Sequence, residues 1–191
     1  LHPWGDLSAL GEDRSTSVIV RGEGAYIFDA EGHRLLDGPA GMWCMQTGYG
    51  RREIADAVAA QIMALSYSTS FSLINTRELE LATRIASQTP GDLNRIFFTT
   101  GGSTAVDSAL RLCQLANNIK GRRGRKHIIS REKAYHGSTF LSASVTGKER
   151  DKTAMDTLQE LVHFLSAPCH YYHPQFATED EFCDFLVAEL E

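Results

Sequence analysis

The stretch FFTTGGSTA, residues 97–105, decides how this sequence is interpreted. An apolar run typical of a buried strand is followed by two glycines and then by a pattern that predicts a helix over residues 103–119. The first turn of a helix has unpaired backbone N–H groups and the positive end of the helix dipole. Glycines let a phosphate approach this backbone, and Ser103 and Thr104 add hydroxyl donors. The stretch therefore indicates either a phosphate site or a tight turn in which Ser103 only caps the helix.

The flanking residues narrow the kind of phosphate. No lysine follows the glycines, which argues against the G-x-x-x-x-G-K-[ST] loop of triphosphate sites. The G-x-G-x-x-G pattern of dinucleotide sites is absent, and no acidic residue ends a second strand to hold a ribose. A single phosphate on a small cofactor fits better.

A second segment, AYHGS at residues 134–138, directly follows a predicted strand over residues 126–130. It is therefore expected at the carboxyl edge of the sheet, next to the phosphate loop. Tyr135 offers an aromatic face to a flat ring, and Gly137 allows close approach of the backbone. Alone, this segment is typical of a turn with a packed tyrosine. Beside a phosphate loop, however, it predicts a ligand that has both a flat ring and a phosphate, which describes pyridoxal phosphate.

The rest of the pattern predicts an α/β fold. A strand, a helix and a strand over residues 95–130 make a βαβ unit, which implies a parallel sheet covered by helices. Further strands and helices are predicted from alternating and helical periodicity, and the helices are expected to bury their apolar faces. After an irregular start through Ser17, strands over residues 17–21, 25–29 and 34–37 are expected to form an antiparallel meander. The helices cover residues 54–65, a stretch that is capped by Asn75 and stops before Pro90, and a stretch that is capped by Thr178 and ends at Glu191. Between the strands and these helices, residues 38–50 form a glycine-rich loop that is expected to be neither helix nor strand.

Composition excludes several other classes. The chain has 191 residues, 42% of them hydrophobic and 23% charged, which excludes intrinsic disorder, and its net charge of −5 argues against a nucleic-acid partner. No apolar run could span a membrane and no signal peptide is expected. The basic stretch at residues 120–126 is interpreted as a solvated connection, and the His170–His173 spacing as no metal site. No cysteine pair has C-x-x-C spacing, so we expect free, mostly buried thiols in a cytoplasmic protein.

Three motifs in register resemble the class III (omega-amino acid) aminotransferases. They are residues 98–111, residues 135–139, and GMWC at residues 41–44 with the nearby residues 48–51. Order and spacing match over nearly the whole chain. Many relatives have S-G-S-E-A at the glycine loop, where this chain has Thr104 in place of the glutamate. This change leaves the phosphate donors intact, but no role of that glutamate carries over.

The resemblance implies a type I pyridoxal-phosphate-dependent transferase fold. Residues 1–50 would form an N-terminal small-domain segment and pocket loop. Residues 51–191 would form the first part of the large, mostly parallel domain that binds the cofactor. It also implies a homodimer with shared active sites, in which the loop over residues 67–71 crosses to the partner subunit.

The same resemblance implies the site residues. Gly102 and Ser103 would hold the phosphate of pyridoxal 5'-phosphate, and Tyr135 would stack on its ring with His136 close by. Trp43 would wall the substrate pocket. No metal and no catalytic residue is expected in this chain.

The family also needs a Schiff-base lysine and an aspartate under the pyridine nitrogen. None of the five lysines here has a matching context, so we expect both groups beyond residue 191, in a subunit more than twice as long. The implied reaction moves an amino group from an amine or omega-amino acid to a keto acid such as pyruvate. The alternatives are an aminomutase or racemase on the same fold, or a non-catalytic fragment that binds phosphate or dimerises.

Overall fold

The computed structural model describes residues 18–152 and 155–191. Its contacts divide the chain into two compact units between Ile96 and Phe97, and each unit is described by itself. The predicted irregular segment up to Ser17 lies outside the described residues.

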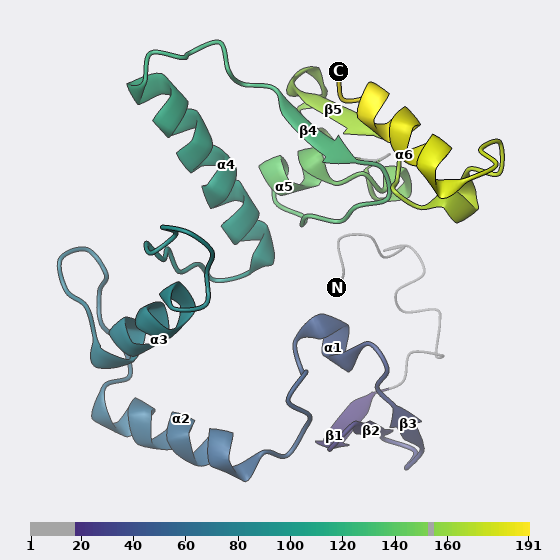
Figure 1. Cartoon of the computed structure of the whole chain (residues 1–191). Coiled ribbons are helices and arrows are strands. Elements are labelled where there is room, and N and C mark those ends of the chain that lie inside the picture. The colour runs from purple at the N-terminus through teal and green to yellow at the C-terminus, as the bar shows by residue number, and fades with distance from the viewer. Residues whose placement is uncertain (1–17, 153–154) are drawn as a thin grey trace. The chain divides into compact units, whose positions relative to one another are not determined.

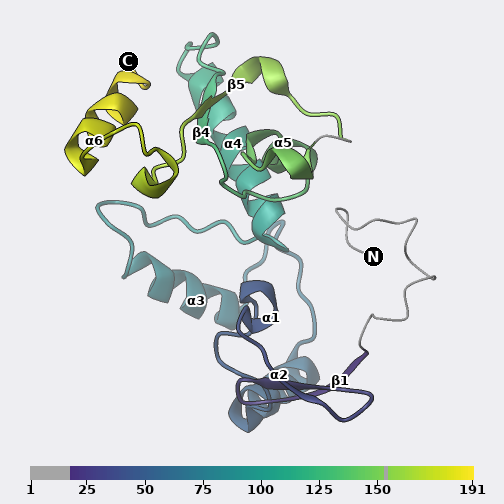
Figure 2. The same cartoon turned by 90° about the vertical axis from the view of Figure 1, so that its right-hand side faces the viewer.

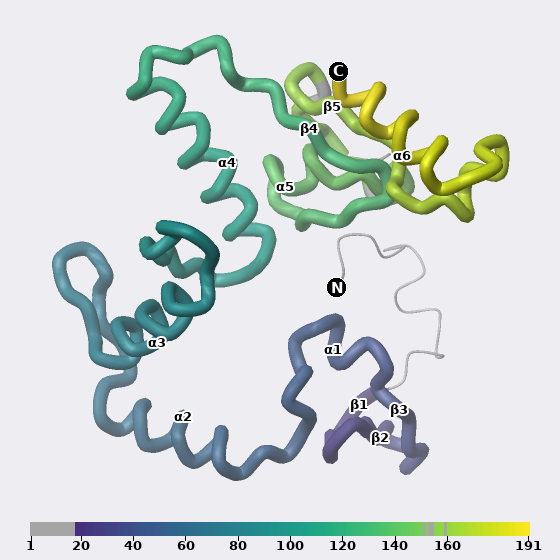
Figure 3. The backbone as a smooth tube through the Cα atoms, in the orientation of Figure 1, coloured from purple at the N-terminus to yellow at the C-terminus, as the bar shows by residue number. Residues whose placement is uncertain are grey.

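The first unit opens with a three-stranded antiparallel meander. Strand β1 (Ile19–Glu23) pairs with β2 (Tyr26–Asp29), which pairs in turn with β3 (Arg34–Leu36), as the backbone in Figure 3 shows. The register shifts between Ile19 and Arg21, where β1 carries an irregularity. The predicted meander is confirmed, with strand ends displaced by a few residues.

A tyrosine ties the glycine-rich loop to this meander. Tyr49 forms a backbone bridge with Gly24, and its hydroxyl donates a 2.7 Å hydrogen bond to Asp37. The loop was expected to contain no helix, but it forms a four-residue turn, α1 (Ala40–Trp43). This turn is not a regular helix, because Met42 within it has left-handed dihedral angles.

Two helices follow the loop, α2 (Arg52–Ala64) and α3 (Thr76–Ala86). The predicted capping of α3 is confirmed, since the Asn75 side chain accepts a 2.9 Å hydrogen bond from the N–H of Glu78. The expectation of buried apolar faces is wrong, because no residue of either helix is buried. The described residues provide no layer that packs over these faces.

The second unit contains a short parallel sheet with helices around it. Helix α4 (Gly102–Ile119), strand β4 (Ile128–Arg131), helix α5 (Phe140–Val145), strand β5 (Val162–Leu165) and helix α6 (Glu179–Ala188) follow in that order. Single 3-10 turns lie at Glu149–Asp151, Gln159–Leu161 and His170–Tyr172. Helix α5 lies beside both α4 and β4 in two perpendicular views (Figures 1 and 2).

The sheet differs from the predicted βαβ unit. Parallel pairing is confirmed, but it joins β4 to β5, with Ile128 opposite Val162. The strand predicted over residues 95–99 is wrong, because this extended segment pairs with no strand among the described residues. Strand β5 was not predicted, although its sequence Val162–Leu165 is largely apolar.

The buried residues of the second unit include hydroxyl side chains beside apolar ones. Val145, Val162 and Phe182 are buried, but so are four hydroxyl side chains. These are Ser130, Ser142, Ser144 and Thr146. Among the described residues, every buried side-chain nitrogen and oxygen atom has a hydrogen-bond partner. The hydroxyls thus form a satisfied polar core around α5, which fixes this region more uniquely than apolar contacts alone.

The last helix and α4 bury less than predicted. Thr178 caps α6 as predicted, accepting from the N–H of Glu181. Phe182 is buried, but Leu190 is 56% exposed, and α4 has no buried residue. The expected burial of these helix faces is therefore wrong for the chain described by itself.

The cysteines and the helix lengths bear on two further expectations. All four thiols are free as expected, but Cys44, Cys113 and Cys183 are exposed, so the expectation of mostly buried thiols is wrong. In the described part of the chain, no helix combines the length and apolar character that crossing a membrane requires.

Candidate functional site

The N-terminus of α4 presents an open first turn. Its N-cap residue, Gly101, has no side chain to cap the helix, and no acidic residue lies in the first turn. A Cβ built on Gly101 or on Gly102 would meet no atom within 4 Å. The first N–H groups of a helix have no partner within the helix. This turn can therefore donate backbone hydrogen bonds to an anion above it.

The predicted second segment meets this turn. The backbone N–H of Ser138 donates to Ser103 Oγ across 3.1 Å. Gly137 is buried with φ +134°, and a Cβ there would lie 2.5 Å from Ser103 Oγ. Only glycine permits this backbone conformation and this close approach. The structure thus brings together Ser103 and the segment over residues 135–138.

The contact leaves Ser103 with a hydrogen to donate. A serine hydroxyl has one donor and two acceptor lone pairs. Because Ser103 Oγ accepts from Ser138, one lone pair is used, and within residues 18–152 and 155–191 the Ser103 hydroxyl donates to no acceptor. Its neighbour Thr104 is used differently, since it donates back to the carbonyl of Gly101 at 2.8 Å.

Two more hydrogen bonds anchor the Tyr135–Thr139 segment. The N–H of His136 donates to the Oγ1 of Thr146 at 3.0 Å, and Thr146 is almost completely buried. The Thr139 hydroxyl donates to Asp107 Oδ1 at 2.8 Å. We did not predict this role for Asp107. Its position four residues after Ser103, on the same face of α4, was a signal that could have revealed it.

Tyr135 remains accessible. It is 40% exposed, and the ammonium group of Lys148 lies 5.4 Å from the centroid of its ring. His136 is half-buried beside it in the chain. A partly exposed aromatic ring in the segment that contacts an open helix N-terminus can take a planar ligand that carries an anion.

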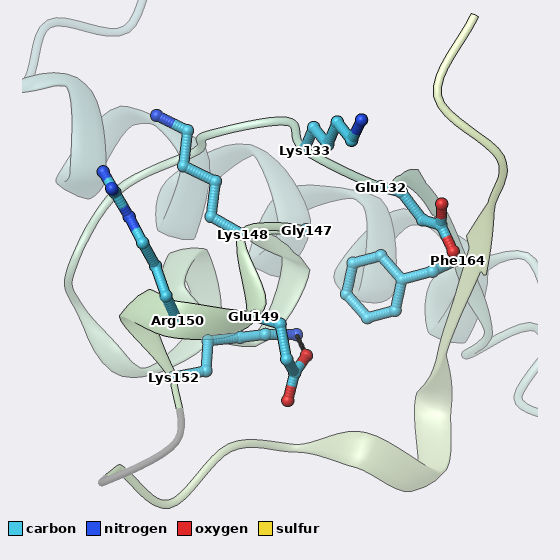
Figure 4. A pocket seen from close by; sticks show the side chains of 8 residues that line it. All are labelled: Glu132, Lys133, Gly147, Lys148, Glu149, Arg150, Lys152 and Phe164. Atoms are coloured by element: carbon cyan, nitrogen blue, oxygen red, sulfur yellow. Dashed lines mark ion pairs between the residues drawn. The ribbon is translucent and has the colours of Figure 1, made fainter. Parts of the chain in front are cut away.

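A charged cavity of about 660 Å³ adjoins this region and is shown in Figure 4. It is lined by Glu132, Lys133, Gly147, Lys148, Glu149, Arg150, Lys152 and Phe164. Lys152 pairs with Glu149 at 3.6 Å, and its ammonium group lies 4.2 Å from the centre of the Phe164 ring. None of the predicted cofactor residues lines this cavity. It is therefore a neighbour of the candidate site and not the site itself.

Trp43 and the loop over residues 67–71 belong to the first unit. Trp43 is 64% exposed at the end of α1. In the loop, Tyr67 is 80% and Phe71 is 97% exposed. These exposed aromatic groups are available for contacts outside their own unit.

The first unit also holds a cluster that we did not predict. Asp29, Glu31 and His33 bring their ligand-type atoms within 4.8 Å of one another at the turn after β2. Burial raises the pKa of Asp29, but hydrogen bonds from the side chain and backbone of His33 outweigh it and leave that pKa lowered. The hydrogen bond and charge of Asp29 in turn raise the pKa of His33. The geometry is that of a turn closed by an ion pair, with His33 N–H and Nδ1 bonded to the two oxygens of Asp29.

Comparison with known proteins defines the class. The family model for class-III aminotransferases matches residues 7–191, and the chain belongs to this family. It is 35% identical to the putrescine–pyruvate aminotransferase of Pseudomonas aeruginosa, over 100% of this chain and 42% of that protein. It is 33% identical to the diaminobutyrate–2-oxoglutarate transaminase of Halomonas elongata, over 94% of this chain and 39% of that protein.

Solved structures of transaminases have the same fold as this chain. A thermostable (S)-enantioselective omega-transaminase from Thermomicrobium roseum is 37% identical with a TM-score of 0.92, covering 100% of this chain and 42% of that one. The omega-transaminase of Pseudomonas jessenii, solved in complex with PMP, is 31% identical with a TM-score of 0.91, over the same shares. The predicted fold class is therefore confirmed, and the chain spans about two-fifths of the length of these relatives.

Proposed function

We propose that the complete protein is a pyridoxal 5'-phosphate-dependent transaminase. It would move an amino group from an amine or omega-amino acid to a keto acid such as pyruvate. Membership of the class-III aminotransferase family and the names of its relatives support this reaction. The observation that carries the proposal is the hydrogen bond from Ser138 N–H to Ser103 Oγ, which joins the two predicted cofactor segments.

The residues present fit this cofactor. Gly102 and Ser103 would hold its phosphate, because the first turn of α4 is open and the Ser103 hydroxyl can still donate. Tyr135, which is 40% exposed, would stack on the pyridine ring, with His136 close by. When bound, the cofactor supplies the carbonyl group that carries nitrogen and the ring that accepts electrons.

In this proposal the chain binds and orients the cofactor, but it does not supply the group that moves a proton between substrate and cofactor. The lysine that does so would lie outside these 191 residues, since none of the five lysines here has the sequence context that the family requires. Lys133 lies 3.3 Å from the ring centre of Tyr172, and Lys126 donates to Asn118 at 2.6 Å. Trp43 would wall the substrate pocket, and residues 1–50 would belong to the small domain, with residues 51–191 in the large one.

We further propose a cytoplasmic homodimer with shared active sites. The highly exposed aromatic residues Tyr67 and Phe71 support it, because such side chains are usually covered in an assembled protein. The loop over residues 67–71 would cross to the site of the partner subunit. A monodisperse monomer of the complete protein in sedimentation would contradict this part of the proposal.

The activity is tested by incubating the complete protein with pyridoxal phosphate, a diamine such as putrescine, and pyruvate. We expect alanine to form in step with loss of the amine. An aminomutase or racemase would leave pyruvate unconsumed, and a non-catalytic protein would consume neither substrate. Either result would overturn the proposed reaction.

A further inference from the structure

A carboxylate of α4 reaches the start of another helix. Asp107 Oδ1 accepts two hydrogen bonds of 2.8 Å, one from the hydroxyl of Thr139 and one from the N–H of Ser142. Helices usually cap their first N–H groups with a side chain of their own N-cap residue. In α5, Thr139 and Ser142 form such a capping box, and the N–H of Ser142 is held in addition by Asp107, a residue 35 positions earlier in the chain. This charge-assisted pair of bonds ties the beginning of α5 to α4.

The segment tied in this way leads directly into the candidate cofactor site. Ser138, which precedes Thr139, donates its N–H to Ser103. Gly137 leaves no free space at this point, since a Cβ there would lie 2.5 Å from both Ser103 Oγ and Ser142 Oγ. A small displacement of Thr139 would therefore change the contact between Ser138 and Ser103.

We infer that Asp107 is a positioning residue of the cofactor site: through Thr139 and Ser142 it fixes the Tyr135–Ser138 segment against Ser103. The inference rests on the proposed function. Asp107 itself would not touch the cofactor. It would direct the Ser103 hydroxyl toward the phosphate and fix the position of the Tyr135 ring.

A substitution at Asp107 separates this role from a general structural one. Asp107→Ala removes the oxygen that accepts both bonds and leaves the N–H of the buried Ser142 with only the capping box of α5, while Asp107→Asn keeps an oxygen at the same place without the charge. Asp184, an exposed carboxylate on α6, provides the matched control Asp184→Ala. Pyridoxal phosphate is titrated into each complete protein, freed of cofactor, and followed by visible absorbance and circular dichroism.

We expect Asp107→Ala to raise the dissociation constant of pyridoxal phosphate about tenfold or more, because two hydrogen bonds to a charged group are lost. It should also change the circular dichroism of the bound cofactor. Asp107→Asn should lie between it and the parent, and Asp184→Ala should match the parent. If Asp107→Ala does not fold, Thr139→Val removes the hydroxyl that donates to Asp107, together with its part in the α5 capping box, and should weaken binding in the same direction. Unchanged affinity and dichroism in the variants that fold, even with a lower melting temperature, would overturn the inference.

Amide hydrogen exchange of the cofactor-free proteins separates this inference from the proposed function. Asp107→Ala or Thr139→Val should accelerate exchange at Ser138 and Ser142, and Asp184→Ala should not. Unchanged exchange would contradict the inference whether or not the parent binds the cofactor. Faster exchange in these variants, together with a parent protein that binds no pyridoxal phosphate, would instead contradict the proposed function, and with it the role assigned to Asp107 there.

Discussion

The backbone N–H of Ser138 lies 3.1 Å from the side-chain oxygen of Ser103, although the two residues are 35 positions apart. This contact joins the turn after β4 to the first turn of α4. It occupies an acceptor site of Ser103 and leaves the hydroxyl hydrogen for a ligand. Two segments that the sequence only predicted to share a sheet edge are thereby held at hydrogen-bond distance.

Gly137→Ala should weaken cofactor binding. The new Cβ would lie 2.5 Å from Ser103 Oγ, and φ of +134° is unfavourable for alanine, so the segment must shift. We expect the dissociation constant of pyridoxal phosphate to rise about tenfold, the loss of roughly one good hydrogen bond. Gly124→Ala is the control, because a Cβ there meets nothing within 4 Å. Equal affinity of both variants would show that the close approach is not needed.

Ser103→Asp should weaken binding more strongly. A carboxylate would replace a hydroxyl that faces the phosphate, and the two like charges repel. Losing the hydrogen bond alone costs about 1.5–3 kcal/mol, or roughly ten- to hundredfold in affinity, before repulsion is added. Ser66→Asp, in an exposed loop, adds the same charge elsewhere. Titration with pyridoxal phosphate that gives the parent affinity for Ser103→Asp would place the phosphate at another site.

Tyr135 should act through its ring and not through its hydroxyl. Tyr135→Phe is expected to keep most of the cofactor affinity. Tyr135→Ala should lose the stacking contact, worth about 0.5–1.5 kcal/mol beyond buried area. The absorbance band of the bound cofactor should shift in the same order. A Tyr135→Ala variant with the affinity and spectrum of the parent would reduce Tyr135 to a packed turn residue.

The turn from Asp29 to His33 should be most stable within a limited range of pH. The pKa of Asp29 is lowered in the folded protein. Its contribution to the stability of the turn is therefore fully present above the ordinary pKa of 3.8 and is lost as pH falls through the lowered pKa. The pKa of His33 is raised in the folded protein. Its contribution to the stability of the turn is therefore fully present below the ordinary pKa of 6.5 and is lost as pH rises through the raised pKa. The protection factor of the His33 amide should be highest between these limits.

His33→Asn is the control for this window, since it removes the upper limit and leaves only the backbone hydrogen bond of residue 33 to lower the pKa of Asp29. Protection that rises steadily from pH 4 to pH 9 in the parent would contradict the assigned ion pair. Protection factors, not raw exchange rates, are compared because intrinsic exchange itself depends on pH.

Local signals predicted local structure well. Asn75 and Thr178 mark helix starts because their side chains bond backbone groups three residues away, an interaction that the sequence spacing alone determines. The glycines before Ser103 likewise marked the start of α4. Such interactions do not depend on residues far along the chain.

Interactions between distant segments could not be predicted in the same way. Burial of Leu79 was expected from helical periodicity, but it depends on a partner surface that the described residues do not provide, and Leu79 is 53% exposed. The strand expected over residues 95–99 failed for the same reason, since a strand needs a neighbour. Asp107 was overlooked because its partners, Thr139 and Ser142, lie more than thirty residues away.

The most direct test is a crystal structure of the complete protein with bound pyridoxamine phosphate. We expect the phosphate within about 3.2 Å of Ser103 Oγ and the backbone N–H groups of the first turn of α4, with the ring against Tyr135. Density for the phosphate elsewhere, for example between Lys148 and Arg150 in the neighbouring charged cavity, would contradict the central claim.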